Sequence, residues 1–333
     1  MAYTLLPEWA PQASVLIVIP PKESDWAYCY DDVLSFYIEL INLVSEHQHT
    51  TVTYTDAETL ALLPKKSNVS YFQIPTNDTW VRDFGPITVK ESGKLTFLDF
   101  GFNGWGLKFA SNFDNQFTKA LKQVSFEDYD YRLADIILEG GSLEYDDNGT
   151  LMTTSECLLS PNRNPHLSKE AVEAKLKSWF GIERVLWVDH GYLSGDDTDS
   201  HIDTLARFCT KDTIAYVKCD DQNDEHYEAL KAMEVQLQTF RDKDGNPYRL
   251  VPLPMTDAIF DEEDGHRLPA TYANFLIMND VVIMPTYNDP HDEEAKANLQ
   301  SCFGDKKVVT IDCSILIRQH GSLHCSTMQI PSV

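Results

Sequence analysis

The chain has 333 residues, with 52 acidic side chains against 27 basic ones and a formal net charge of −25 at pH 7. A field of this sign repels a phosphate backbone, so nucleic acid is not expected as a partner, whereas a cationic substrate would be attracted. Solubility alone is the other explanation of the charge. No apolar run approaches the length of about 18 residues that a membrane-spanning helix needs, so no membrane partner is expected either.

Seven cysteines are scattered along the chain, and none belongs to a Cys-x-x-Cys pair. A disulfide framework or a structural zinc site is therefore not expected. The N-terminus has no basic stretch before an apolar block, which argues against a secretory signal. We expect a cytoplasmic protein in which most thiols are small core side chains.

Short apolar runs predict strands, and the longer stretches between them predict helices. In chain order, strands are expected at 14–19, 51–54, 86–90, 95–100, 150–153, 184–188, 213–218, 248–253, 273–278, 281–285 and 307–311. Helices are expected at 31–46, 112–124, 168–180, 224–240 and 292–303. Ser168 is the predicted N-cap of one of them, and Asn279-Asp280 is a predicted hairpin turn. The repeating motif is two or three strands, one helix, then another strand. Because no linker interrupts the chain, we expect one closed domain over 1–333.

The segment 80–86, with the sequence WVRDFGP, ends in a turn that leads into a predicted strand. Asp83 would then lie where a loop meets a sheet. Trp80 offers an aromatic surface that suits an alkyl chain or a cation. The alternative is a turn aspartate that caps its own backbone beside a core tryptophan.

Glu139 follows the apolar residues 136–138 and precedes two glycines, Gly140 and Gly141. Glycines let a ligand or another backbone segment approach closely. Glu139 is therefore either a site carboxylate or an exposed strand end.

The acidic block 196–203 has the sequence DDTDSHID. If it is a strand, His201 and Asp203 share one face. The carboxylate can then bind a cation or hold the imidazole in one tautomer. A solvated acidic loop is one alternative. A catalytic metal site is another, since Asp197, Asp199 and His201 alternate, although the block lacks the glycine and the final glutamate of an EF-hand.

Cys325 lies in the segment 320–326, with the sequence HGSLHCS. A thiol with a histidine partner is a potential nucleophile, and a buried structural thiol is the alternative. In an extended segment, the side chain of His324 points away from that of Cys325. His201 is therefore the better candidate for the base.

With these residues in view, the chain resembles the agmatine deiminase family, which is related to the Porphyromonas-type peptidylarginine deiminases. The resemblance covers nearly the whole chain. The sequence departs from the family pattern at Ser200, where glycine is frequent, and at Thr204, where asparagine is frequent. It also departs in residues 319–322, the segment that precedes Cys325. The similarity rests on six ordered segments: 77–86, 138–142, 157–165, 197–203, 268–275 and the segment around Cys325.

The resemblance implies an α/β fold: a five-bladed, pseudo-symmetric α/β propeller of the pentein type, with ββαβ-like units around a central active site. It also implies a cysteine mechanism that uses no metal and no other cofactor. The implied catalytic residues are Cys325 as nucleophile, His201 as general acid and base, and Glu139. The implied substrate-binding residues are Asp83 and Asp203, with Glu139, for the guanidinium, Trp80 beside the substrate, and Asp197 for a distal ammonium.

The implied reaction is hydrolysis of agmatine to N-carbamoylputrescine and ammonia through an S-alkylthiouronium adduct, a step of putrescine and polyamine synthesis. Agmatine carries a second cation and no carboxylate, which suits Asp197 and Asp199. The rival substrates are arginine and peptidyl arginine. A non-catalytic binder on the same scaffold and a metal hydrolase are rivals of a different class. The family suggests a homodimer.

Carboxylates next to a thiol need an explanation, because their charge opposes formation of the thiolate that attacks. A bound cation about 4 Å away would contribute roughly 4 kcal/mol at an effective dielectric constant of ~20. That energy corresponds to about three pKa units. We therefore expect the substrate to help ionise the thiol that attacks it.

Overall fold

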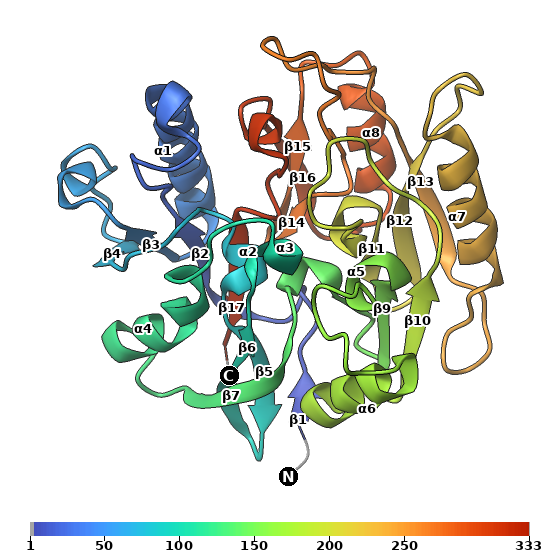
Figure 1. Ribbon diagram of the computed structural model, residues 1–333, viewed down its shortest axis with the longest axis horizontal. Coiled ribbons are helices and arrows are strands. Elements are labelled where there is room, and N and C mark those ends of the chain that lie inside the picture. The colour runs from blue at the N-terminus through green and yellow to red at the C-terminus, as the bar shows by residue number, and fades with distance from the viewer. Residues whose placement is uncertain (1–2, 333) are drawn as a thin grey trace.

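The structure is a computed structural model that describes residues 3–332. Its strands form five separate sheets, in the orders β1-β5-β6-β7, β10-β9-β8, β11-β12-β13, β14-β15-β16 and β17-β2-β3-β4 (Figure 1). The strand bounds are β1 Tyr3–Leu5, β2 Gln12–Val18, β3 Thr50–Tyr54, β4 Val69–Gln73, β5 Ile87–Glu91, β6 Lys94–Gly101, β7 Asp130–Ile137, β8 Glu144–Tyr145, β9 Thr150–Thr154, β10 Arg184–Val188, β11 Ala206–Thr210, β12 Thr213–Lys218, β13 Arg249–Pro254, β14 Leu276–Ile277, β15 Val281–Thr286, β16 Lys307–Asp312 and β17 Thr327–Pro331.

Each sheet contains an antiparallel strand pair next to a parallel one. For example, β5 pairs antiparallel with β6, and β6 pairs parallel with β7. A parallel pair needs a long crossover connection, and in each sheet a helix lies within that connection. The crossover helices are α1 Tyr30–His47, α4 Phe117–Val124, α6 Lys169–Phe180, α7 Tyr227–Thr239 and α8 Asp292–Gln300. The chain is thus an α/β protein whose sheets repeat one ββαβ-like pattern.

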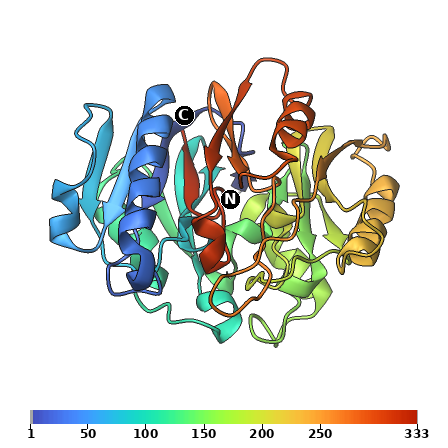
Figure 2. The same ribbon diagram turned by 90° about the horizontal axis from the view of Figure 1, so that it is seen from above.

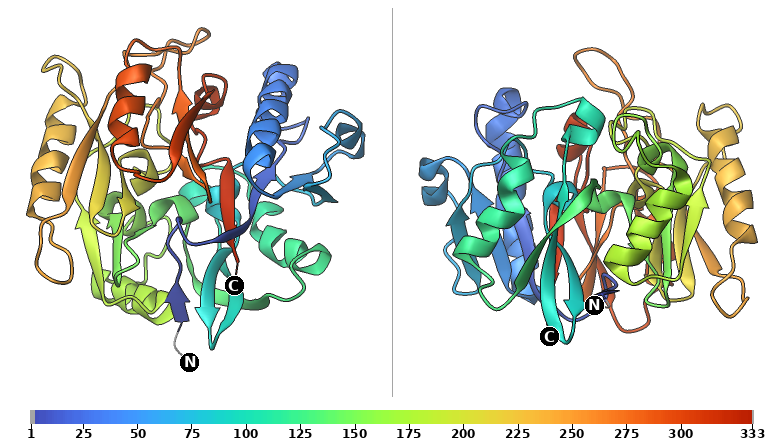
Figure 3. Two further views of the ribbon diagram at one scale, coloured as in Figure 1. Left: turned by 180° about the vertical axis from the view of Figure 1, so that it is seen from behind. Right: turned by 60° about the horizontal axis from the view of Figure 1, so that its bottom comes forward.

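The helices lie toward the outside of the molecule, with α1 and α7 at opposite sides of the view in Figure 2. Sheets covered by helices are buried on both faces, so the sequences of their strands are nearly continuous runs of apolar residues. In β2, Val15 to Val18 are all fully buried. β1 and the end of β17 both lie in the lower half of the molecule in the two views of Figure 3.

Most predicted elements are present with nearly the predicted bounds. Ser168 caps α6 by accepting a hydrogen bond from the amide of Ala171, and Gly181 ends that helix in the left-handed conformation. Asn279-Asp280 turns between the antiparallel strands β14 and β15, as predicted. The predicted strand at 273–278 is much shorter, since β14 has only two residues.

Short elements at the strand ends carry the chemically interesting side chains. They are the helix α2 Val81–Phe84, the 3₁₀ turns Gly140–Ser142 and Ile202–Thr204, and the turn that precedes β17. None of the helices within residues 3–332 has both the length and the apolar character needed to cross a membrane. All seven cysteines are free thiols.

Candidate active site

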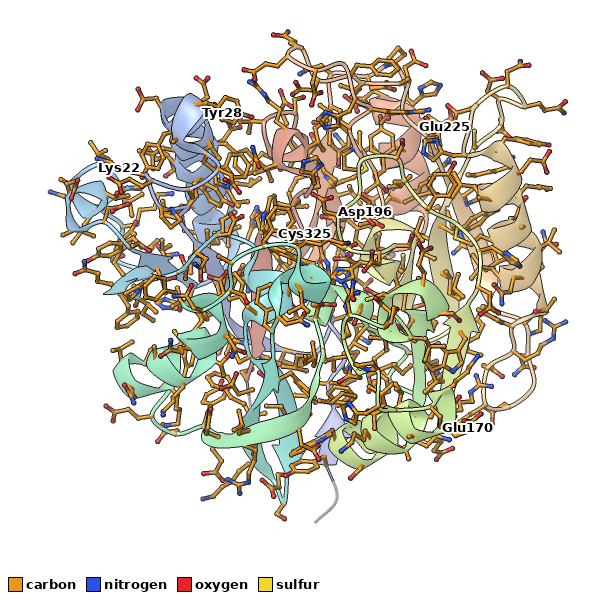
Figure 4. All side chains as sticks on the ribbon, in the orientation of Figure 1. Lys22, Tyr28, Glu170, Asp196, Glu225 and Cys325 are labelled. Carbon is orange, nitrogen blue, oxygen red and sulfur yellow. The ribbon has the colours of Figure 1, made fainter. Side chains whose placement is uncertain are left out.

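A cavity of about 430 Å³ opens beside Cys325, which Figure 4 labels near the centre of the molecule. We call it the thiol pocket. Four of the residues predicted from the sequence line it: Trp80, Asp83, Asp197 and Cys325. The other lining residues are Asp25, Asp78, Trp105, Phe109, Thr198, Gln319, His320 and Gly321. The described lining residues include carboxylates and aromatic rings but no lysine or arginine.

Two more predicted side chains, those of His201 and Asp203, lie behind this pocket and meet Asp83 around Gly141. A methyl group added at Gly141 would lie 2.7 Å from Asp83 Oδ1, 2.7 Å from His201 Nδ1 and 3.1 Å from Asp203 Oδ2. Real Cβ contacts are not that short, so only glycine leaves room for the three groups to meet. The close approach that the two glycines suggested in the sequence therefore occurs.

His201 is fully buried between two carboxylates. Its Nε2 donates to Glu139 Oε2 at 3.3 Å, and its Nδ1 lies 3.5 Å from Asp83 Oδ1. Burial opposes the charged ring, but the charge of Asp83 and the contacts with Cys157 and Glu139 raise the pKa of His201 well above its ordinary value. The ring is thus an imidazolium at neutral pH and can act as an acid.

Arg163 holds Glu139 in place. Its Nε donates to both carboxylate oxygens, at 3.0 and 2.7 Å, and both side chains are fully buried. Its Nη1 donates to Asp199 Oδ2 at 2.6 Å, and Lys108 reaches the other oxygen of Asp199 at 2.7 Å. Against the effect of burial, His201 and Arg163 lower the pKa of Glu139. Glu139 is therefore an ionised partner for the imidazolium.

Asp83 faces the pocket from α2. The amide of Gly141 donates to its Oδ1 at 2.9 Å, and the indole of Trp105 donates to its Oδ2 at 2.8 Å. Burial raises the pKa of Asp83 to about 6, although His201 opposes the shift. A cation that binds in the pocket would favour the ionised carboxylate.

Asp203 is fully buried and has one bonded oxygen. His324 Nδ1 donates to its Oδ2 at 2.7 Å, and its Oδ1 has no partner among residues 3–332. Burial opposes ionisation, but His324 lowers the pKa of Asp203. Asp203 is therefore an ionised carboxylate whose Oδ1 can still accept a hydrogen bond.

Cys325 is 5% exposed and lies in the turn before β17. Its amide and that of His324 both donate to Asn274 Oδ1, at 3.2 and 2.8 Å. Burial and the charges of Asp203 and Asp83 raise the pKa of the Cys325 thiol well above its ordinary value. In the empty site the group is thus a neutral thiol.

Trp80 forms one wall of the pocket. A methyl group added at Gly321 would lie 2.3 Å from its ring, so the glycine lets the backbone pack flat against the indole. Trp80 also packs against Trp26, with ring centroids 5.9 Å apart and the ring planes tilted by 46°. The ring is thus fixed with little freedom to move.

Asp197 lies at the outer part of the pocket, with a side chain that is 38% exposed. His320 Nε2 lies 3.6 Å from its Oδ2. Asp78, which is half-buried, also lines the pocket and accepts a hydrogen bond from Trp26 at 3.0 Å. The outer part of the cavity is therefore acidic.

The strand considered for His201 and Asp203 and the extended segment considered around Cys325 do not occur. Residues 201–203 do not form a strand: His201 precedes a 3₁₀ turn over Ile202–Thr204, and β11 starts only at Ala206. The two side chains still meet, because the tight turn directs both toward Gly141. The segment before β17 is a turn rather than an extended strand, yet the ring of His324 bonds Asp203 and not the thiol.

The alternating set Asp197, Asp199 and His201 does not form a metal-binding group, because Arg163 and Lys108 occupy the two oxygens of Asp199. Another trio, Glu139, Cys157 and His201, has potential ligand atoms within 4.8 Å of one another. Arg163 already forms a buried ion pair with Glu139 in that trio. A metal ion would therefore have to displace the guanidinium or bind next to its positive charge.

Sequence reasoning assigned no role to several residues that build this site. Arg163 and Asn274 lie in segments 157–165 and 268–275, so the motifs that carry the resemblance contained them. Glu8 and Trp105 lie outside those segments and carried no signal. Their importance follows only from the folded chain.

A family model described as Porphyromonas-type peptidyl-arginine deiminase matches residues 4–331. The agmatine deiminase of Pseudomonas putida is 32% identical, over 98% of this chain and 94% of that protein. A putative agmatine deiminase of Marinomonas sp. is 33% identical, over 97% of this chain and 93% of that protein.

Solved structures are similar over the same length. A cysteine-to-serine variant of the C. jejuni agmatine deiminase with substrate bound is 39% identical, with a TM-score of 0.94 over 99% of this chain and 96% of that one. A putative arginine deiminase from Porphyromonas gingivalis is 46% identical, with a TM-score of 0.94 over 99% and 98% of the two chains. A dimethylarginine dimethylaminohydrolase, 11% identical, shares only the fold, with a TM-score of 0.50 over 96% of this chain and 100% of that one. The chain belongs to the Porphyromonas-type peptidyl-arginine deiminase family, together with the agmatine deiminases, as its sequence segments predicted.

Proposed function

We propose that the protein is an agmatine deiminase, a hydrolase that converts the guanidinium of agmatine into a urea with release of ammonia. One observation carries this proposal. Carboxylates from separate segments, an imidazole and a thiol meet around Gly141 and the thiol pocket, and no described basic side chain other than His320 lines that pocket. Such a set is poorly suited to an anionic or neutral substrate and well suited to a cation.

The guanidinium fits the carboxylates by charge and by shape. It offers five N–H donors in one plane, and carboxylates bind such a plane with paired, charge-assisted hydrogen bonds. Asp83 and the free oxygen of Asp203 would receive these donors. Trp80 would lie beside the substrate, and the sulfur of Cys325 would lie next to its central carbon.

In the first half-reaction, binding of the cation offsets the two carboxylate charges and the Cys325 thiol loses its proton to solvent. The thiolate adds to the central carbon and gives a neutral tetrahedral adduct. The imidazolium of His201 then donates a proton to one amino group, which leaves as ammonia. A cationic S-alkylthiouronium and a neutral His201 remain, and Glu139 orients the ring throughout.

In the second half-reaction, His201 takes a proton from water, and the hydroxide adds to the thiouronium carbon. The C–S bond breaks, the thiolate departs, and the adduct loses a proton as the urea forms. The overall change is guanidinium and water to urea and ammonium. His201 thus acts first as acid and then as base.

The acidic outer part of the pocket favours agmatine over arginine. The distal ammonium of agmatine would face Asp197, Asp78 and Asp25, whereas the α-carboxylate of arginine would be repelled there. The alternative, deimination of arginine or of peptidyl arginine, needs a basic or open distal site. Among the seven predicted residues, Asp197 is the one whose role depends on this substrate choice.

The five repeated ββαβ-like sheets support a five-bladed propeller of the pentein type, with the site at its centre and residues 1–333 as one catalytic domain. The free thiols support a cytoplasmic location, as reducing compartments keep cysteines unpaired. The protein would act as a homodimer without a cofactor, and its product would feed putrescine and polyamine synthesis.

The test is incubation of the purified protein with agmatine and, separately, with arginine. Release of ammonia together with the ureido product N-carbamoylputrescine, at a kcat/KM for agmatine well above that for arginine, supports the proposal. A preference for arginine or peptidyl arginine would move the assignment to the alternative. Turnover that a chelator abolishes would point instead to a metal hydrolase.

A further inference from the structure

Asp203 has one oxygen that is held and one that is free. Its Oδ2 accepts a hydrogen bond of 2.7 Å from His324 Nδ1, and its Oδ1 is buried without a partner among the described residues. Substrate binding as proposed above uses the free oxygen. The residue that holds Oδ2 therefore decides where Oδ1 points.

His324 is held in turn by Glu8, which is 316 positions away in the chain. The Nε2 of His324 donates to Glu8 Oε2 at 2.8 Å. Glu8 lies between β1 and β2, and its other oxygen accepts from the amide of Ile277 at 2.7 Å. A fixed carboxylate thus anchors the far side of the imidazole ring.

Each ring nitrogen of His324 faces a carboxylate oxygen, Nδ1 that of Asp203 and Nε2 that of Glu8. The neighbouring buried charges are the carboxylates of Asp203, Glu8 and Glu144 and the guanidinium groups of Arg82 and Arg207. Against the effect of burial, Arg207 and then His324 lower the pKa of Glu8.

We infer that Glu8 and His324 are positioning residues for the guanidinium site: His324, fixed by Glu8, holds one oxygen of Asp203 so that the other oxygen is presented to the substrate. Neither residue touches the reacting atoms. The inference rests on the proposed function and adds to it a role for two residues that lie behind the site.

Two substitutions of His324 separate its two hydrogen bonds. The amide nitrogen of asparagine can take the place of Nδ1, so His324→Asn can keep the bond to Asp203 and lose the bond to Glu8. The amide nitrogen of glutamine can take the place of Nε2, so His324→Gln can keep the bond to Glu8 and lose the bond to Asp203. Both substitutions replace the imidazole with a neutral amide, so they form a matched pair.

Agmatine binding is measured by calorimetry in a Cys325→Ala background, where turnover does not interfere. We expect His324→Gln to weaken binding by about tenfold or more, which corresponds to about 1.4 kcal/mol, and His324→Asn to weaken it clearly less. Equal weakening by the two variants would overturn the positioning role of the Asp203 bond.

Glu8→Gln and Glu144→Gln provide the second comparison. Both carboxylates pair with Arg207, but only Glu8 bonds His324. We expect Glu8→Gln to raise the KM for agmatine several-fold with a smaller effect on kcat, and Glu144→Gln to leave both nearly unchanged in protein that remains folded. Equal effects of Glu8→Gln and Glu144→Gln would show that Glu8 acts only as a partner of Arg207 and has no positioning role.

Nitrogen NMR of the His324 ring gives a readout that does not depend on mutant folding. We expect a proton on Nδ1 in the unsubstituted protein, because the hydrogen bond to Asp203 requires one, and an Nδ1 without a proton would overturn the inference. The two proposals fail differently: a protein that does not hydrolyse agmatine defeats the proposed function. If the protein is active but the two His324 variants bind agmatine equally well, only the positioning role of Glu8 and His324 is rejected.

Discussion

At the scale of single residues, the site depends on a thiol that keeps its proton until substrate arrives and on an imidazolium that serves as an acid. Burial, with the charges of Asp203 and Asp83, keeps Cys325 a thiol, while Asp83 and the contacts with Cys157 and Glu139 keep His201 protonated. A neutral thiol is a poor nucleophile, and an imidazolium cannot activate it as a base. The charge of the substrate is therefore part of the mechanism.

Replacing Cys325 with alanine tests its role directly. We expect turnover of agmatine to fall by roughly a thousandfold or more, because the covalent adduct cannot form, while agmatine still binds to the carboxylates. Ammonia release and calorimetry measure the two quantities. Cys219→Ala, at a cysteine outside the thiol pocket, is the control and should retain turnover. Substantial activity in Cys325→Ala would reject the nucleophile.

The residues that carry reactive groups could be predicted from the sequence, since a cysteine, a histidine and paired carboxylates in motifs are visible there. The residues that orient them could not. Glu8 and Trp105 contact His324 and Asp83 across long stretches of chain, and nothing in their local sequence indicates this. Arg163 was visible only as part of a matching segment.

At the scale of elements, the turns at strand ends set the geometry of the site. Gly141, in the turn Gly140–Ser142, is where Asp83 from α2 and His201 and Asp203 from another turn converge. A one-carbon addition at this point must push at least one of them away, since two of the three contacts would be 2.7 Å.

We therefore expect Gly141→Ala to lower kcat/KM by roughly a hundredfold, the cost typical of displacing catalytic groups by about 1 Å. Gly304→Ala is the matched control, because a methyl group there meets nothing within 4 Å. Circular dichroism confirms that both variants are folded. Wild-type kcat/KM in Gly141→Ala would show that these groups need not meet.

Apolar runs predicted the buried strands well, and the strands that were missed lack such runs. β7, with the sequence DYRLADII, places charged and exposed residues within the strand, so its pattern is broken. The predicted strand at 273–278 is cut short because Asn274 bonds the backbone of His324 and Cys325 instead of a neighbouring strand. The spacing of His201 and Asp203 would also fit one face of a strand, but a tight 3₁₀ turn brings the two side chains together instead.

At the scale of the whole molecule, the chain has a net charge of −25, and the substrate proposed for its pocket is a cation. Such a field raises the association rate of a cationic substrate and is screened by salt, with a Debye length of about 30 Å at 0.01 M and about 3 Å at 1 M. The negative charge that makes nucleic acid an unlikely partner is thus also expected to speed the binding of a cationic substrate.

We expect kcat/KM for agmatine to fall several-fold as potassium chloride rises from about 0.01 M to about 0.5 M, with little change in kcat. Steady-state kinetics at several salt concentrations measure both constants. The comparison of kcat with kcat/KM is the internal control. A kcat/KM that does not respond to salt would show that the field plays no part in capturing the substrate.

The claim that a bound cation ionises Cys325 is tested most directly by the pH dependence of Cys325 alkylation. It is measured with and without a bound ligand, and Cys325→Ala is the blank. Because carboxylates and burial raise the thiol pKa in the empty site, alkylation should begin only at alkaline pH. A saturating alkylguanidinium that is not turned over should move the midpoint down, by up to about three units, while the uncharged alkylurea of the same shape should not. A midpoint that stays the same with the guanidinium would contradict the claim that a bound cation ionises its own attacker.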